Sequence, residues 1–415
     1  MTSFYDTLEN RAPADREADL LKALPAQVAH ARSQSAAFAE ILANVDPAQI
    51  TSRTALASLP VTRKHELLER QQALRSQTPF GGFATIGFGA QMPRVFASPG
   101  PIYEPEGIRR DYWRMARAMY AAGFRAGELI HNCFSYHFVP AGSMMESGAH
   151  AMGCTVFPGG TGQTEQQVQA MAELRPAGYI GTPSFLKLIV EKAQEMQVPL
   201  PSVTKALLSA EAFPPSLRDW FAERGITGYQ CYGTADLGLI AYETEAREGL
   251  VLDENVIVEI VRPGTGDPVP EGEVGELVVT TLNTDYPLIR FGTGDLSAIL
   301  PGPCPTGRTN ARIKGWMGRA DQTTKVRGMF VHPGQVAAIA SRFPQVVRAR
   351  LVVSGEMAND QMVLQVETTE TSGGLATQLA EVTREITKLR GVVELVAPGT
   401  LPNDGKVIED ARSYK

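Results

Sequence analysis

Residues 129–196, LIHNCFSYHFVPAGSMMESGAHAMGCTVFPGGTGQTEQQVQAMAELRPAGYIGTPSFLKLIVEKAQEM, decide the fold class. Short apolar runs in this stretch predict three strands, at residues 129–134, 154–157 and 179–180. Segments with helical spacing follow these runs and predict three helices, at residues 144–152, 165–174 and 185–196. Thr164 and Gln167 have the spacing of a capping box at the second helix. Because strands that alternate with helices are typical of crossover connections, the stretch predicts a large multi-layer α/β domain.

The sequence on either side of this stretch extends the prediction to two domains. On the N-terminal side, helical spacing predicts helices up to residue 74, among them 64–74, and a helix at 109–122 that Gly123 closes. On the C-terminal side, short strands between residues 250 and 299 predict an antiparallel β subdomain. A small α+β domain should follow, with these elements: helix 333–341, strands 349–353 and 362–366, helix 375–389 and strand 392–396. We expect an N-terminal domain of residues 1–320 and a C-terminal domain of residues 321–415.

Composition and charge exclude several classes of protein. The 415 residues are 43% hydrophobic and 20% charged, which excludes a disordered chain. The net charge of −6 argues against non-specific binding to nucleic acid or to an anionic membrane. Four cysteines without a CxxC pair indicate reduced thiols, and the N-terminal residues lack the apolar core of a secretory signal. We therefore expect a cytoplasmic protein.

Acidic residues recur beside glycine turns in the second half of the chain. The segments are YGTAD (232–236), FGTGD (291–295), GRAD (318–321), which runs on to GMF (328–330), and LPNDGK (401–406). A single acid after a glycine turn is usually a turn former rather than a ligand. The order of the four segments along the chain is more informative than any one of them.

With these motifs the sequence resembles the adenylate-forming superfamily of acyl-CoA synthetases, luciferases and adenylation domains, in its phenylacetate–CoA ligase branch. The most specific match is GRADQTTKVRGMFVHPGQV, residues 318–336, and the resemblance covers nearly the whole chain. It implies an enzyme that activates an aromatic carboxylic acid with ATP and Mg²⁺ through an acyl-adenylate and transfers it to the thiol of coenzyme A. Branch habit also implies a pairing of two chains.

The resemblance assigns roles to individual residues of the nucleotide site. Asp236 would help to hold Mg²⁺ and Lys406 would bridge the carboxylate and the α-phosphate; these two are the expected catalytic residues. Asp295 would accept hydrogen bonds from the ribose hydroxyls, as an ionised carboxylate can only accept. The other expected nucleotide-binding residues are Tyr232, Gly233, Thr234, Glu211, Arg319, Ser98 and Gly100.

Further roles concern the acid, the hinge and coenzyme A. Asp321 matches the hinge about which the C-terminal domain turns, and the turn formed by Gly328, Met329 and Phe330 would line the tunnel for pantetheine. An aromatic cluster after the first predicted strand would wall a planar acid: Phe134, Tyr136, His137 and Phe138. For Phe134 and Phe138 an ordinary core position is an equally good interpretation.

The expected phosphate loop departs from the family pattern. Residues 96–105, FASPGPIYEP, keep Ser98 and Gly100 but contain three prolines, no threonine and no lysine. A proline has no N–H to offer a phosphate, and Glu104 would repel a triphosphate if it pointed inward.

Two interpretations of this departure remain open. In one, the enzyme still adenylates, and cations elsewhere hold the phosphates. In the other, ATP chemistry is lost, and the fold moves an acyl group between CoA and the pantetheine of a carrier protein or only binds its ligands. Lys406 favours the first, because transacylation alone gives no reason to keep an adenylation lysine.

Two other features invite a ligand and are better explained without one. The glycine-rich residues 157–164 lack the Gly-Lys-Ser/Thr ending of a phosphate loop, which favours a connection. The histidines and cysteines do not have the spacing of a zinc site, and Thr306 stands where a second cysteine would accompany Cys304.

Overall fold

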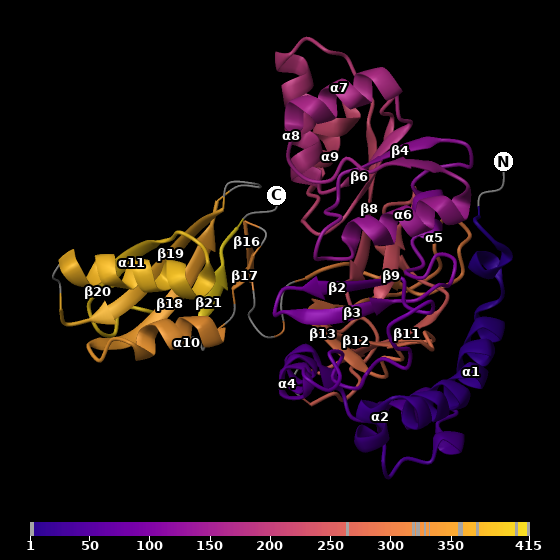
Figure 1. The fold of residues 1–415 in the computed structure, drawn as a ribbon, viewed down its shortest axis with the longest axis horizontal. Helices are drawn as coiled ribbons and strands as arrows, with labels where there is room; N and C mark the ends of the chain where they lie inside the picture. Colours follow the sequence, from indigo (N-terminus) through magenta and orange to yellow (C-terminus); the bar gives the residue numbers. More distant parts are fainter. Residues whose placement is uncertain are drawn as a thin grey trace. The chain divides into compact units, whose positions relative to one another are not determined.

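The computed structural model describes residues 4–262, 265–317, 320, 324–327, 329–331, 333–355, 360–370, 373–402 and 406–412. The chain divides into two compact units, Met1–Met317 and Gly318–Lys415. Figure 1 shows a large α/β unit and a smaller α+β unit. The boundary expected at residues 320–321 falls in a segment of which residues 318–319 and 321–323 lie outside the described residues. The predicted α/β class is confirmed.

The large unit is built on a nine-stranded sheet with the order β14-β15-β10-β9-β8-β7-β6-β4-β5. Its strands are β4 (Leu129–Asn132), β5 (Thr155–Phe157), β6 (Gly178–Gly181), β7 (Lys205–Leu208), β8 (Thr227–Thr234), β9 (Gly238–Glu243), β10 (Leu250–Leu252), β14 (Ile299–Leu300) and β15 (Arg312–Ile313). Strands β4 to β8 are parallel to one another, and β9, β10, β15 and β14 continue the sheet with antiparallel pairs. The parallel strands run in the order β5-β4-β6-β7-β8, so the winding direction reverses between β4 and β6. Ligands of open α/β sheets bind beyond the carboxyl ends of the strands at such a reversal.

Helices connect the parallel strands, as predicted for residues 129–196. They are α6 (Ala141–Met152), α7 (Thr164–Leu174), α8 (Pro183–Glu195) and α9 (Pro215–Ala222), while α5 (Ala116–Ala121) precedes β4. The predicted capping box is wrong: Thr164 is the first helical residue, and the side chain of Gln167 bonds to His131 and to the carbonyl of Gly159. The side-chain amide of Gln167 therefore makes tertiary hydrogen bonds instead of capping the helix.

The predicted helix at 109–122 is wrong in its first half, since α5 begins at Ala116. Asp111 and Arg114 have φ values of 50° and 64°, in the left-handed region that interrupts a helix. The Asp111 carboxylate accepts hydrogen bonds from the N–H groups of Met115 and Ala116, and so caps α5 from outside. The side chain of Arg114 binds Asp253 on another part of the chain.

A second, four-stranded sheet has the order β1-β13-β12-β11. Its strands are β1 (Thr62–Arg63), β11 (Val256–Val261), β12 (Gly275–Thr281) and β13 (Phe291–Ser297). The antiparallel order of β11, β12 and β13 confirms the predicted subdomain, although β10 and β14 belong to the large sheet. β1 was not predicted, and it pairs parallel with β13.

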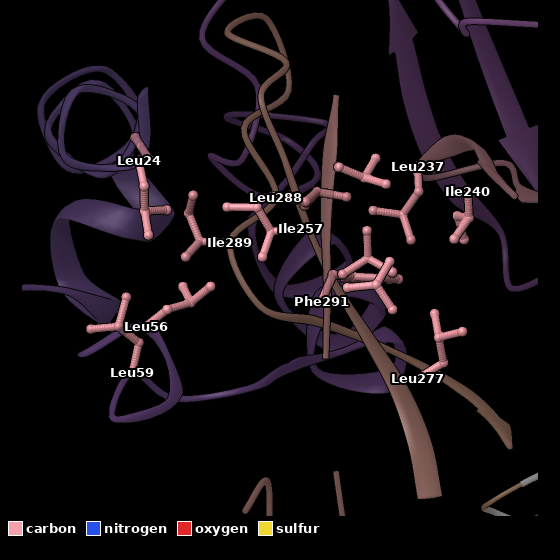
Figure 2. Packing of buried hydrophobic residues seen from close by; sticks show 14 of the residues in the cluster. Leu24, Leu56, Leu59, Leu237, Ile240, Ile257, Leu277, Leu288, Ile289 and Phe291 are labelled. Carbon is pink, nitrogen blue, oxygen red and sulfur yellow. The ribbon is translucent and has the colours of Figure 1, made fainter. Parts of the chain in front are cut away.

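The N-terminal helices are η1 (Thr7–Asn10), α1 (Pro13–Gln34), α2 (Ala36–Ile41), η2 (Pro47–Gln49), α3 (Arg53–Ala57) and α4 (Lys64–Leu74). Buried residues of α1, α2, α3 and α4 share one core with the second sheet. Figure 2 shows Leu24 of α1 and Leu56 of α3 on one side of Phe291, with Leu237 and Ile240 of the β8–β9 region on the other. Each fully buried leucine or phenylalanine contributes roughly 1.5–3 kcal/mol. One apolar core thus joins the N-terminal helices, β13 and the β8–β9 turn.

A short hairpin completes the large unit, formed by β2 (Arg94–Ser98) and β3 (Ile102–Glu106). Its turn contains Pro99, Gly100 and Pro101. α4 packs against β3, β13 and β1. The segment expected to be the phosphate loop is therefore the end of a β-hairpin.

The small unit contains the hairpin β16 (Thr324–Val326) and β17 (Met329–Val331), followed by α10 (Pro333–Ser341), β18 (Val346–Ser354), β19 (Gln361–Thr368), α11 (Gly373–Thr387), β20 (Val392–Val396) and β21 (Ile408–Asp410). Its sheet has the order β20-β19-β18-β21. The bounds of α10 and β20 are the predicted ones, whereas β21 was missed. No helix in the described ranges is long and apolar enough to cross a membrane.

Candidate active site

The turn between β8 and β9 presents Asp236. The register shifts between Tyr232 and Gly233, and such bulges re-aim side chains near active sites. A β-carbon on Gly233 would lie 2.6 Å from the carbonyl oxygen of Gly238, so only glycine lets the strands approach this closely. Thr234 Oγ1 accepts a hydrogen bond of 3.1 Å from the N–H of Leu237, whose buried side chain anchors the turn in the core. These features fix the backbone around Asp236.

The carboxylate of Asp236 is buried, and only one of its two oxygens has a hydrogen-bond partner among the described residues. Its side chain is 1% exposed, and Oδ2 lies 2.8 Å from Lys64 Nζ. Oδ1 has no hydrogen-bond partner among the described residues. A buried carboxylate oxygen without a partner is costly unless a ligand or cation completes it.

Lys64 was not among the residues that the sequence predicted for the site. It is the first residue of α4, directly after β1, and the pairing of β1 with β13 fixes its position. Arg63 reinforces this pairing, since Nη1 lies 2.6 Å from Glu276 Oε1 on β12. The ammonium lies far from Asp236 in sequence, and the side chain is 36% exposed. It brings a cation to the site from the N-terminal helices.

Asp295 lies on β13 and binds two aromatic side chains. Its Oδ2 accepts a hydrogen bond of 2.7 Å from Tyr232 Oη, and its Oδ1 accepts one of 3.1 Å from Trp316 Nε1. β13 thus carries one predicted site residue and, through β1, holds Lys64. The structure brings Tyr232 and Asp295 together and brings Asp236 to Lys64.

The β2–β3 hairpin has turned its polar groups inward. Ser98 Oγ and the Ser98 N–H both bond to the carboxyl group of Glu104, which is fully buried. Burial, and secondarily the charge of Asp236, raises the pKa of Glu104 to about 8, although Lys64 and Ser98 oppose the shift. The repulsion expected between Glu104 and a triphosphate is therefore reduced, because the neutral acid predominates at pH 7. Gly100 lies exposed at the tip of the turn.

The aromatic cluster beyond β4 is divided. Phe134 is buried in the core, whereas Phe138 is 76% exposed and His137 is also exposed. Tyr136 is half-buried, and its hydroxyl accepts a hydrogen bond of 2.8 Å from Asn132 Nδ2. The carbonyl of Phe138 accepts a hydrogen bond from Ala97 of β2, which joins this loop to the hairpin. Tyr136 is the member of the cluster that combines partial burial with a fixed polar tip.

Glu211 follows β7 at the carboxyl edge of the parallel strands. It is exposed, and its Oε2 accepts a hydrogen bond of 3.2 Å from the Ser184 N–H in the first turn of α8. A carboxylate at this position also interacts favourably with the helix dipole. Glu211 therefore links the ends of β6 and β7, beside the reversal of strand order.

The remaining predicted residues belong to the small unit. Lys406 precedes β21, its side chain is exposed, and its carbonyl oxygen lies 3.4 Å from Arg350 Nη1. Met329 begins β17 and is 38% exposed. Arg319, Asp321 and Gly328 lie outside the described residues, as does the side chain of Phe330. Their roles stay predictions.

Other candidates for a ligand site are explained by packing. All four cysteines are buried, and all four are free thiols. In the part of the chain that the structure describes, no three residues among the histidines, cysteines and acids lie close enough together to hold a metal ion.

Comparison with known proteins assigns the family. The sequence model of the family described as AMP-binding enzyme matches residues 110–284. A phenylacetate–coenzyme A ligase of Thermus thermophilus is 33% identical over 344 residues, which are 79% of this chain and 75% of that protein. The chain belongs to the phenylacetate–coenzyme A ligase family. The enzyme of that name from Escherichia coli is 31% identical over 347 residues, 80% of this chain and 77% of the other.

Solved structures agree with membership in this ligase family. A crystal structure of 2-hydroxyisobutyryl-CoA ligase with 2-HIB-AMP and CoA has a TM-score of 0.84 at 25% identity, covering 100% of this chain and 93% of that one. The amide bond synthetase McbA from Marinactinospora thermotolerans shares the fold alone, with a TM-score of 0.54, 18% identity and coverage of 76% and 68%. The predicted resemblance is confirmed, and the protein is an adenylate-forming acyl-CoA ligase that uses an adenine nucleotide and coenzyme A.

Proposed function

We propose that this ligase activates an aromatic carboxylic acid of the phenylacetate or benzoate type. The relatives named phenylacetate–coenzyme A ligases support this substrate class, as does the half-buried ring of Tyr136 beyond β4. In the first step a carboxylate oxygen attacks the α-phosphorus of ATP, and pyrophosphate leaves. In the second step the thiol of coenzyme A attacks the acyl carbon, and AMP leaves.

The observation that carries the ATP-dependent step of the proposal is the carboxylate of Asp236, of which one buried oxygen lacks a partner among the described residues. Its Oδ1 is buried without a partner among the described residues, which suits a hard cation. Mg²⁺ usually binds one or two protein carboxylates and completes its shell with water and substrate phosphates, so one carboxylate fits this ion. When bound, Mg²⁺ supplies charge that offsets the charge developing on the phosphates.

The other residues bind and orient the nucleotide in this proposal. Asp295, held by Tyr232 Oη at 2.7 Å, accepts hydrogen bonds from the ribose hydroxyls. Arg319 reaches the ribose or a phosphate, and Glu211 lies beside the adenine. Asp321 is the hinge of the small unit, and the turn of residues 328–330 lines the tunnel for pantetheine.

Exchange of labelled pyrophosphate into ATP tests the first step directly. A panel should include phenylacetate, substituted benzoates and 2-hydroxyisobutyrate, with thioester formation followed separately on coenzyme A and on a holo carrier protein. We expect exchange with at least one aromatic acid and product on coenzyme A. Acyl transfer between coenzyme A and the carrier protein without ATP, together with no exchange, would favour the transacylase.

Lys406→Ala tests the role of the small unit. Loss of an ammonium that bridges the carboxylate and the α-phosphate should lower adenylation by about 10²–10³-fold, the range for one preorganised charged group. Thioester formation from a supplied acyl-adenylate should change little, because the lysine acts in the first step only. Lys22→Ala, an exposed lysine of α1, is the control. Equal losses in both steps would contradict the assignment.

A further inference from the structure

Two arginines of β18 bind the segment of the small unit that contains Lys406. Arg348 donates from Nη1 to the carbonyl of Leu401 at 3.3 Å and from Nη2 to the carbonyl of Pro402 at 2.5 Å. Arg350 donates from Nη1 to the carbonyl of Lys406 at 3.4 Å. Because the two arginines are two positions apart on one strand, their side chains lie on the same face of the sheet. They can therefore hold the segment on both sides.

Arg350 is itself fixed by burial and by an ion pair. Its side chain is 2% exposed, and its Nη2 lies 2.6 Å from Glu409 Oε2 on β21. The next residue of β18, Leu351, donates its N–H to the carbonyl of Val407 at 2.9 Å. A buried guanidinium is costly unless its partners compensate for the lost water, and here the partners lie on β21 and on Lys406. The position of the Lys406 backbone is therefore tied to Arg350.

A second set of contacts holds the β16–β17 hairpin. Thr324 Oγ1 of β16 donates to Asp410 Oδ2 of β21 at 2.8 Å. Arg412, which is 11% exposed, donates to Thr324 Oγ1 at 3.0 Å and to Asp360 Oδ1 at 3.1 Å, and it also pairs with Asp410. Asp360 in turn accepts a hydrogen bond of 2.9 Å from the N–H of Arg327 in the hairpin. Arg412 thus joins the hairpin to β21 and to the residue that precedes β19.

The two sets of contacts use different residues of β21. Glu409 binds Arg350, and the next residue, Asp410, binds Arg412. Because consecutive residues of a strand point to opposite faces of the sheet, removal of one arginine should leave the contacts of the other in place. The small unit can therefore hold the two segments independently.

We propose that Arg350 and Arg412 are positioning residues for different half-reactions of this ligase. Arg350 holds the segment of Lys406 for adenylation, and Arg412 holds the β16–β17 hairpin, whose turn includes residues 328–330, for thioester formation. This rests on the proposed roles of Lys406 and of that turn. Neither arginine contacts a substrate in this assignment. Each acts through the segment that it holds, since a displacement of about 1 Å at a catalytic group can cost about a hundredfold in rate.

The test compares Arg350→Met with Arg412→Met, so that each variant is the control for the other. Exchange of labelled pyrophosphate into ATP measures adenylation, and thioester formation from supplied acyl-adenylate measures the second step. We expect Arg350→Met to lower kcat for exchange by about ten- to a hundredfold, while KM for ATP and thioester formation stay within about threefold. Arg412→Met should have the reverse effect on the two steps. Arg384→Met, on an exposed arginine of α11, should leave both steps unchanged.

Amide hydrogen exchange, followed by mass spectrometry, tests the two sets of contacts without turnover. Arg350→Met should speed exchange in peptides that cover residues 401–407 and leave residues 324–331 as in the wild type, and Arg412→Met should do the reverse. Circular dichroism checks that each variant is folded. If a methionine variant does not fold, Arg350→Lys or Arg412→Lys carries the same comparison, because lysine keeps the charge but has one nitrogen in place of three.

The pattern across the two variants decides the proposal. Equal loss of both steps in each variant would mean that the arginines serve the fold of the unit as a whole, and faster hydrogen exchange in both segments would mean the same. Unchanged rates in both folded variants would also overturn the proposal. If the wild type exchanges no label with any acid, the proposed function fails, and the hydrogen-exchange pattern still decides whether the two arginines hold separate segments.

Discussion

The β2–β3 and β8–β9 turns are neighbours in space and treat their polar side chains in opposite ways. In the β8–β9 turn, Thr234 satisfies the backbone, and the carboxylate of Asp236 keeps one buried oxygen without a partner among the described residues. In the β2–β3 hairpin, Ser98 of β2 and Glu104 of β3 bond to each other. The β8–β9 turn leaves a buried oxygen that a ligand would complete in the proposed function, whereas the polar groups of the β2–β3 hairpin bond to each other.

This difference shows that the parts of a binding site can be distributed over several elements. The hairpin contains three prolines and no lysine, while Lys64 brings a cation to Asp236 from α4. A phosphate responds to the charge and the donors around it, whichever element supplies them. Each variant below tests one side of the comparison.

Asp236→Asn should have the largest effect, because it removes the negative charge from the ligand-facing turn. We expect adenylation to fall by about 10²–10³-fold and the dependence on Mg²⁺ concentration to shift to higher values. Exchange of pyrophosphate at several Mg²⁺ concentrations measures both. Asp219→Asn, an exposed acid of α9, is the control. Wild-type exchange in Asp236→Asn would remove the basis for calling this turn the ligand-facing one.

Glu104→Gln tests the closed turn, and we expect a gain in stability that depends on pH. The pKa of Glu104 is raised from 4.5 to about 8 in the fold, chiefly by burial, so the folded state keeps a proton that the unfolded chain has lost. Wild-type stability is therefore full below about pH 4.5 and falls as the pH rises to about 8. Glutamine can replace the neutral acid, since it both donates to and accepts from Ser98.

Urea unfolding at several pH values measures this effect. The free energy of unfolding of Glu104→Gln should exceed that of the wild type by roughly 2–5 kcal/mol at pH 8, with the difference shrinking toward pH 4.5. Glu223→Gln, on an exposed residue after α9, should show no such trend. A constant difference across this range would mean that Glu104 is ionised in the fold.

Much of the fold could be predicted because local periodicity and packing agree. The helices at residues 64–74 and 333–341 and the strand at 392–396 have the predicted bounds. Predictions failed where a side chain bonds to a residue far away in the sequence instead of to its own helix. Arg114 binds Asp253 and interrupts the helix predicted at 109–122, and Gln167 binds His131 in place of capping α7.

The candidate site was predictable only in part, for the same reason. Short glycine-containing motifs predicted Tyr232 and Asp236, which share the segment YGTAD, and Asp295, which lies in FGTGD. Lys64 lies in an ordinary helix start, and its role depends on the pairing of β1 with β13, which one sequence does not reveal. The hydrogen bonds from Ser98 to Glu104 likewise depend on the register of the hairpin, which the sequence does not reveal.

Tyr232→Phe should have the smallest effect and tests how the ligand-facing turn supports Asp295. It removes the hydrogen bond of 2.7 Å to Asp295 Oδ2, while Trp316 still donates to Oδ1. Loss of one such bond is worth about 0.5–1.5 kcal/mol, so KM for ATP should rise about two- to tenfold with kcat nearly unchanged. If Tyr232 acts on the ribose through Asp295, the variant should also discriminate less between ATP and 2′-deoxy-ATP. Tyr229→Phe on the same strand is the matched control, because its ring lies against Arg247. Equal losses with both nucleotides would show that Tyr232 supports the turn as a whole rather than the proposed ribose-binding role of Asp295.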